Sequence, residues 1–227
     1  MPRPGFVLNV DRSTPPTLMW RGEGFSLEKF PADRSRIIYG PEPLPAIDDI
    51  DGAIRHALLN PIDQDPLPSL LFPGMKLTIA FDDISLPLPK MRRPDIRQRV
   101  IEAVLDLAAA AGVDDVHLIC ALALHRRMTE AELRHAVGDR VYDAFAPSGA
   151  LYQHDAEDPD NLVDLGTTSH GEEVEINKRA AESDLLVYVN INPSTPGKVI
   201  GPSFAAEEVP DVIEALIETY RRERRSG

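Results

Sequence analysis

Three polar stretches of this chain carry side chains that could do chemistry. Asp83 and the hydroxyl of Ser85 follow the apolar run at 76–81, and His125 follows the apolar run at 116–124. A carboxylate and an imidazole at such positions can accept and donate protons. The third stretch, 190–198, ends at Lys198, a cation suited to a phosphate or a carboxylate. The plainer interpretations are an Asx-turn with solvated acids, a structural histidine and a solvated lysine.

The elements that must hold these side chains alternate between strand and helix. Residues 76–81 and 116–124 read as buried strands, as expected of parallel strands covered on both sides. Between them, 94–111 has a helical apolar stripe with a proline near its start and Gly112 after its end. A capping box opens another helix that runs to about residue 137. This order predicts a three-layer α/β domain with a mostly parallel sheet and helices on both faces. Ligands usually sit at the strand ends of such sheets, which is where Asp83 and His125 fall.

The stretch at 162–192 is the most informative part of the chain. It predicts a strand at 162–165, a second strand ending at residue 176, a short helix capped by Asn177, and a strand at 185–189. Two glycines bracket the polar tip that contains Thr167 and Thr168, whose hydroxyl and backbone donors could bind a ligand. A tight polar hairpin without a ligand fits this tip equally well.

Composition excludes several classes of protein. The net charge of −13 argues against a nucleic-acid partner, because binding phosphates requires a basic surface. No apolar run approaches the roughly 20 residues of a membrane span, and the N-terminus lacks the apolar core of a secretory signal. The single cysteine, Cys120, lies in an apolar run, which predicts a buried structural thiol and a cytoplasmic protein. The six histidines are scattered without metal-binding spacing, so no metal site is predicted from spacing.

The domain organisation follows from where the prolines and apolar runs lie. Residues 1–48 alternate short apolar pieces with proline and glycine, which predicts short strands at the edge of the same domain. Residues 49–200 form the α/β domain, and residues 201–227 contain an amphipathic C-terminal helix.

Three segments together resemble a known family. They lie at 60–89 (with FDDISLP), 121–139 (with LHRR) and 154–192 (with INK). In this order they are similar to the N-terminal domain of lactate-racemase-like proteins, and the resemblance covers roughly residues 45–200. The family's usual forms are Asp-x-Thr-Arg-Pro, Gly-x-His-Arg-Pro and Ile-Asn-Lys before a Gly-Gly-x-Lys-Ser loop. The resemblance implies a nickel-pincer nucleotide tethered to a lysine, hydride transfer from the α-carbon of a 2-hydroxy acid, and histidine as acid and base.

Carried over by motif, the resemblance makes Asp83 and His125 catalytic. It makes Lys198 the cofactor-bearing lysine, with Ser85 at the family's threonine. We expect Thr167 and Thr168 to contribute to cofactor binding. Leu86 stands where the family has an arginine that contacts substrate.

Two hypotheses follow from this mixture of retained and lost residues. The first is a racemase or epimerase acting on a small hydroxy acid, with its site completed by a second subunit or another copy. The second is a non-catalytic binding or assembly subunit that keeps the fold. The retained Asp83, His125 and Lys198 favour the first, and Leu86 together with the loss of the family's second acid–base histidine favours the second.

Overall fold

The structure is a computed structural model that describes residues 7–21, 24–39, 46–84 and 91–191. The chain divides into two compact units, Met1–Ile47 and Asp48–Gly227. Their boundary lies beside the predicted end of the N-terminal segment at residue 48. Ser85, Leu86, Lys198 and the helix predicted within 201–227 lie outside the described residues.

The first unit consists of two antiparallel strand pairs. β1 (Val7–Asn9) pairs with β4 (Arg36–Ile38), and β2 (Thr17–Arg21) pairs with β3 (Gly24–Glu28). Short strands at a sheet edge were predicted here, and in the described residues the strands of this unit pair with one another. That this unit belongs to the same domain as the second stays a prediction.

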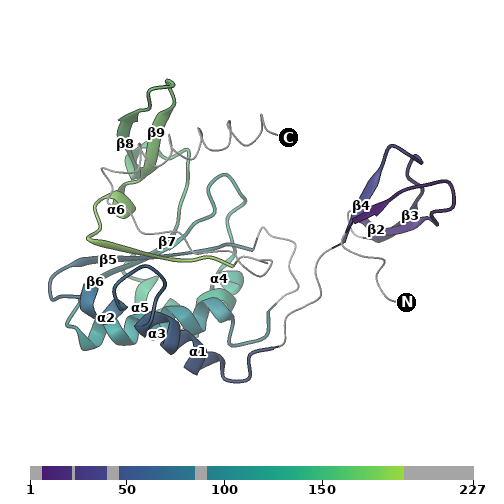
Figure 1. Ribbon diagram of the computed structural model, residues 1–227. Helices are drawn as coiled ribbons and strands as arrows, with labels where there is room; N and C mark the ends of the chain where they lie inside the picture. The colour runs from purple at the N-terminus through teal and green to yellow at the C-terminus, as the bar shows by residue number, and fades with distance from the viewer. Residues whose placement is uncertain (1–6, 22–23, 40–45, 85–90, 192–227) are drawn as a thin grey trace. The chain divides into compact units, whose positions relative to one another are not determined.

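A four-stranded parallel sheet forms the centre of the second unit (Figure 1). Its order is β10 (Leu185–Val189), β5 (Lys76–Phe81), β6 (Asp115–Cys120) and β7 (Leu151–Gln153). The two central strands coincide with the two strongest apolar runs of the sequence. Because all four strands run the same way, their carboxyl ends meet at one edge of the sheet.

Helices cover the two faces of this sheet unequally (Figure 1). One face carries the larger helices, and the other carries a hairpin with a one-turn helix. The predicted α/β class, with a parallel sheet and helices on both faces, is confirmed. The first face holds α1 (Ile50–Leu59), α2 (Leu67–Leu70), α3 (Ile96–Ala110), α4 (Glu130–Val137) and α5 (Asp139–Phe145); the second holds β8 (Leu162–Thr167), β9 (Glu173–Asn177) and α6 (Lys178–Ala181), with the 3-10 turn η1 (Pro159–Asn161) before β8.

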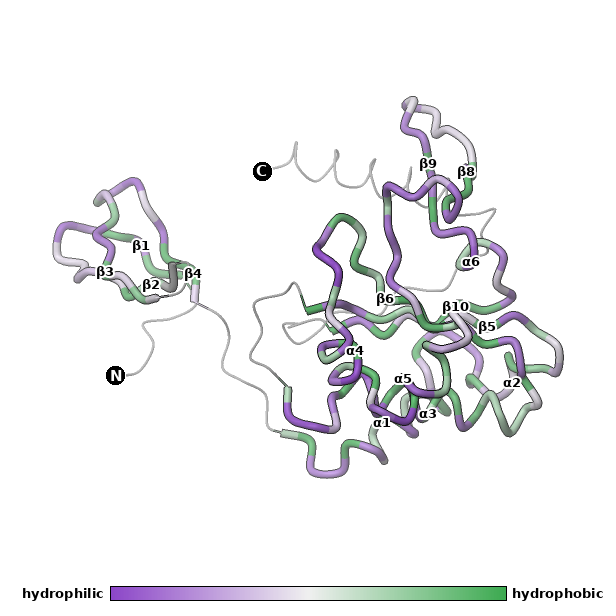
Figure 2. The backbone as a smooth tube through the Cα atoms, turned by 180° about the vertical axis from the view of Figure 1, so that it is seen from behind, coloured by the Kyte–Doolittle hydropathy of each residue, from purple (hydrophilic) through white to green (hydrophobic). Residues whose placement is uncertain are grey.

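The hydrophobic core lies between the sheet and α3. Alternate side chains of β5 and β6, such as Phe81 and Leu118, are fully buried against Ile101 and Val104 of α3. Thr78 is also fully buried, but on the opposite face. Burial on both faces explains why the sequences of these strands are nearly continuous apolar runs. Figure 2 colours the chain by the hydropathy of each residue.

Several local predictions are confirmed by the backbone. Asn177 caps α6 by accepting a hydrogen bond from the backbone N–H of Ala180 at 3.2 Å. Thr129 and Glu132 form the predicted capping box at the start of α4. Each cap satisfies backbone donors that a helix leaves unpaired at its first turn.

The strand predicted at 116–124 is shorter than expected, and the difference matters for the site. β6 ends at Cys120, because a tight turn follows in which Ala123 has a φ of 51° and the N–H of His125 donates to the carbonyl of Leu122 at 2.8 Å. Residues 121–124 are all apolar, so the sequence pattern predicted that the strand continued through them. The turn returns the chain across the end of β5 and so places His125 beside it.

Candidate functional site

Asp83 and His125 come together at the carboxyl edge of the sheet. Asp83 follows β5, His125 follows β6, and the two strands are neighbours in parallel register. Nδ1 of His125 lies 2.9 Å from Oδ2 of Asp83. The Asp83 side chain is 8% exposed and that of His125 is 53% exposed, so the carboxylate is enclosed while the ring faces solvent.

This contact determines which nitrogen of the His125 ring carries the proton. A carboxylate can only accept a hydrogen bond, so Nδ1 of His125 carries the proton. In the neutral ring, Nε2 then keeps its lone pair. A half-exposed imidazole held in this tautomer by a carboxylate is arranged as a general base.

The adjacent acid, Asp82, contacts the end of β10. Its Oδ1 accepts from the hydroxyl of Tyr188 at 2.7 Å, and its Oδ2 accepts from the backbone N–H of Ile191 at 2.6 Å. Burial, followed by the hydrogen bond to Asp82, raises the pKa of Tyr188 to about 12. Asp82 therefore ties the end of β10 to the end of β5, and of the two neighbouring acids it is Asp83 that meets the histidine.

A buried ion pair lies under the loop that carries both acids. Arg97, in the first turn of α3, meets Asp95 through two contacts, Nε to Oδ1 at 3.0 Å and Nη2 to Oδ2 at 2.8 Å. Asp95 is completely buried and the side chain of Arg97 is 6% exposed. The sequence analysis missed this pair. The available signal was an N-cap aspartate followed two residues later by an arginine at the start of an apolar helix face.

The other predicted site residues are placed elsewhere or not described. Thr167 ends β8 and is exposed, and Thr168 is buried in the turn that follows. The Thr168 hydroxyl bonds to the carboxylate of Glu172 and accepts from the backbone N–H groups of Glu172 and His170. The structure thus places both threonines on a hairpin that stands off the sheet face (Figure 1), a different element from the Asp83–His125 pair. Their cofactor-binding role stays a prediction.

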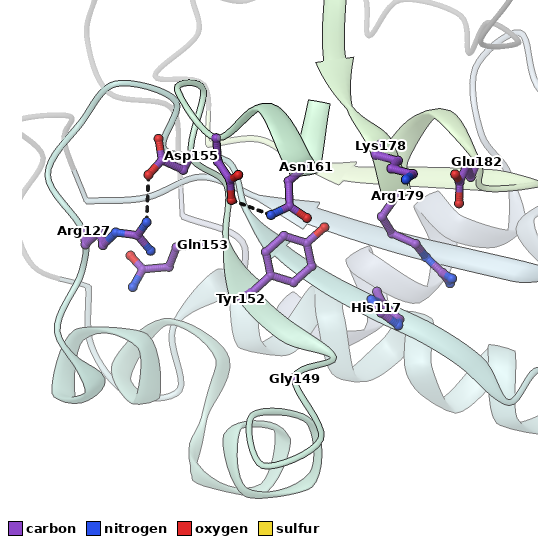
Figure 3. Close-up of a pocket in the computed structure, with 11 residues that line it drawn as sticks. His117, Arg127, Gly149, Tyr152, Gln153, Asp155, Asn161, Lys178, Arg179 and Glu182 are labelled. Carbon is purple, nitrogen blue, oxygen red and sulfur yellow. Dashed lines mark hydrogen bonds and ion pairs between the residues drawn. The ribbon is translucent and has the colours of Figure 1, made fainter. Parts of the chain in front are cut away.

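A polar cavity of about 480 Å³ lies on the hairpin side of the sheet (Figure 3). Its lining includes His117, Tyr152, Lys178 and Arg179 but neither Asp83 nor His125. Arg179 is held by Asp115 at 2.8 Å. Burial, together with the charge of Arg179, lowers the pKa of His117. This cavity is therefore separate from the acid–base pair.

Cys120 and the acidic groups offer no alternative centre in the part of the chain that the structure describes. Burial raises the pKa of the Cys120 thiol to about 12, so it stays protonated and is not a nucleophile at neutral pH. Among the described residues, no group of three or more His, Cys, Asp or Glu side chains is arranged to hold a metal ion. The helices within the described ranges are all too short or too polar to cross a bilayer.

Comparison with known proteins places this architecture in a family. The model of the lactate racemase N-terminal domain matches residues 22–194. Lactate racemase from Lactiplantibacillus plantarum is 27% identical over 134 residues, and that from Thermoanaerobacterium thermosaccharolyticum is 27% identical over 139 residues. Each alignment covers 59% of this chain and 29% of the relative. The chain belongs to the family defined by the lactate racemase N-terminal domain.

A solved structure agrees with the fold. The lactate racemase apoprotein from Thermoanaerobacterium thermosaccharolyticum superposes with a TM-score of 0.50 at 24% identity, covering 68% of this chain and 36% of that one. This chain therefore spans about a third of the length of the relatives it matches.

Proposed function

We propose that this chain is the acid–base part of a racemase or epimerase that acts on a 2-hydroxy acid or a related hydroxylated metabolite. The observation that carries the proposal is the 2.9 Å contact between His125 and Asp83 at the carboxyl edge of the parallel sheet. Membership of the lactate racemase N-terminal domain family supports it.

The proton transfer uses this chain's own residues. Nε2 of His125 would accept the proton of the substrate hydroxyl, and the resulting imidazolium would be stabilised by the carboxylate of Asp83 through Nδ1. The His125 side chain is 53% exposed, so a substrate can approach the ring from solvent, whereas the Asp83 carboxylate is enclosed. Racemisation also requires the hydride that leaves the α-carbon to return on the other face of that carbon, after which Nε2 would give the proton back to the oxygen.

The family's nickel-pincer nucleotide, when bound, would supply the hydride acceptor. Lys198, Ser85, Thr167 and Thr168 are the residues proposed to hold it. The described residues provide no metal-ligand cluster of their own. Because the family's second acid–base histidine is lost here, we propose that a second subunit or another copy contributes to the site.

The proposal is tested with protein purified from its native host. Intact mass and nickel content are measured on one sample, and racemisation of a panel of 2-hydroxy acids is followed by chiral chromatography. A covalent adduct that disappears in Lys198→Ala, with near-stoichiometric nickel, supports the cofactor assignment.

The same assay tests the acid–base residue. His125→Asn should lower the rate by about 10²–10⁴-fold, the range for losing a positioned general base. His56→Gln is the matched control, since His56 is an exposed histidine on α1. Equal rates for the two variants would refute the role of His125. An unmodified mass, no nickel and no racemisation would instead support the non-catalytic binding or assembly subunit, which Leu86 at the family's arginine position favours.

A further inference from the structure

One nitrogen of Arg97 contacts both carbonyl groups that flank the α-carbon of Asp83. Nη1 of Arg97 donates to the carbonyl oxygen of Asp82 at 2.8 Å and to that of Asp83 at 3.0 Å. The first carbonyl belongs to the peptide plane before the Asp83 α-carbon, and the second belongs to the plane after it. Since a peptide unit is planar and rigid, these two contacts restrict the rotations φ and ψ on either side of the Asp83 α-carbon.

Restricting these two angles also restricts the direction of the Cα–Cβ bond. We propose that Arg97 is a positioning residue that aims the Asp83 carboxylate at Nδ1 of His125 and thereby selects the tautomer of the histidine. This inference extends the proposed function, because it assigns the tautomer-selecting role to a residue that does not touch the ring. Arg97 acts on His125 through the backbone of Asp83.

Asp95 holds the guanidinium in place for this task. Its two oxygens engage Nε and Nη2 of Arg97, and Oδ1 also accepts from the Arg97 backbone N–H at 2.9 Å as the cap of α3. The guanidinium is planar, so these contacts leave Nη1 pointing toward the loop. A fully buried charge is tolerated in a folded protein only when it is paired. Asp95 and Arg97 are both buried, and each is the partner of the other.

The third group near the pair is His135. Its Nε2 lies 3.8 Å from Oδ2 of Asp95 and 2.9 Å from the carbonyl oxygen of Met91. A carbonyl only accepts, so Nε2 of His135 carries a proton and donates it to the carbonyl oxygen of Met91. Asp95 holds Arg97 from the helix side, while Nη1 of Arg97 holds the loop.

The test measures the tautomer of His125 directly. Protein labelled with ¹⁵N-histidine is studied by NMR at alkaline pH, where imidazoles are neutral, and the His125 signals are assigned by their loss in His125→Asn. The wild type should show one tautomer, protonated at Nδ1. In the double variant Asp95→Ser, Arg97→Leu, the two nitrogen signals should move toward each other as both tautomers become populated.

This double variant is chosen so that the protein still folds. Serine can keep the helix cap, and removing both charges of a buried ion pair together leaves no unpaired buried charge. Arg97→Lys is the second variant, since one ammonium cannot reproduce the fork, and it should give an intermediate pattern. The matched control is Arg99→Lys on the same helix, where Arg99 pairs at the surface with Asp51 at 2.7 Å; it should keep the wild-type pattern.

The outcomes separate this inference from the proposed function. A folded double variant that keeps the single wild-type tautomer overturns the positioning role of Arg97. If the double variant does not fold, an unchanged pattern in Arg97→Lys overturns it. The measurement needs neither substrate nor cofactor, so a failure to detect racemisation leaves this result standing and refutes only the reaction.

Discussion

Ala123 occupies a backbone conformation that suits glycine, and replacing it with glycine should stabilise the protein. Its φ of 51° lies in the left-handed region, which costs an L-residue about 1–2 kcal/mol. Glycine removes that cost but adds about 0.5–1 kcal/mol of backbone entropy lost on folding. The net expectation for Ala123→Gly is a gain of about 0.5–1 kcal/mol in the free energy of unfolding.

Ala123 stands two residues before His125, in the tight turn that follows β6. Its side chain is exposed, so the substitution removes no core packing. The assay is urea unfolding followed by circular dichroism, with thermal melting as a second measurement. For a domain of this size, about 0.5–1 kcal/mol corresponds to a rise in Tm of about 1–4 °C.

The matched control for this prediction is Ala57→Gly. Ala57 is an exposed alanine within α1, where glycine should lower the free energy of unfolding by about 0.5–1 kcal/mol. The same chemical change should therefore act in opposite directions at the two positions. If Ala123→Gly lowers stability as Ala57→Gly does, the argument that backbone strain at residue 123 shapes the His125 turn is refuted.

Two pH effects follow from shifted pKa values. The hydroxyl of Tyr188 should titrate at about 12, so the difference between the alkaline absorbance titrations of wild type and Tyr188→Phe should isolate one phenol with that midpoint. Because the pKa of Tyr188 is raised in the folded state, this hydroxyl contributes stability that is complete below pH 10 and lost between pH 10 and 12. A titration midpoint of Tyr188 near pH 10 would contradict its contact with Asp82. The hydrogen bond from Arg126, followed by that from the Thr129 backbone, lowers the pKa of Glu132 to about 2. Its contribution is present above pH 4.5 and lost as the pH falls toward 2, so the free energy of unfolding should fall less steeply with acid in Glu132→Gln. An unchanged slope would count against the contacts of Glu132 with Arg126 and with the Thr129 backbone.

The local elements could be predicted from the sequence because short-range patterns determine them. The strands at 76–81 and 185–189 coincide with β5 and β10, and the caps at Thr129 and Asn177 are where the residue types placed them. The spacing of apolar residues in a helix or a strand shows which side chains are buried, and this spacing can be read from residues that are close together in the sequence. The α/β class followed from the alternation of these elements.

The candidate site was only partly visible in the sequence. Asp83 and His125 stood out because each followed an apolar strand, and the parallel pairing of β5 and β6 brought them to 2.9 Å. Which of the two adjacent acids would meet the histidine was not encoded locally. That depended on Tyr188 and Ile191, which are more than a hundred residues away and hold Asp82 instead.

The sequence by itself determined the fold class, several of the strands and helices, and the strand-end positions of Asp83 and His125. It did not predict β7, α2 or α5. The tertiary structure decided the turn at Ala123, the burial of Arg97 with Asp95, and the contact of Arg97 with both carbonyls of the acidic loop. The physical reason is that a turn hidden in apolar residues leaves no periodic signal. The contacts of a buried charged side chain likewise cannot be read from the sequence, because the folded chain brings the contacting groups together.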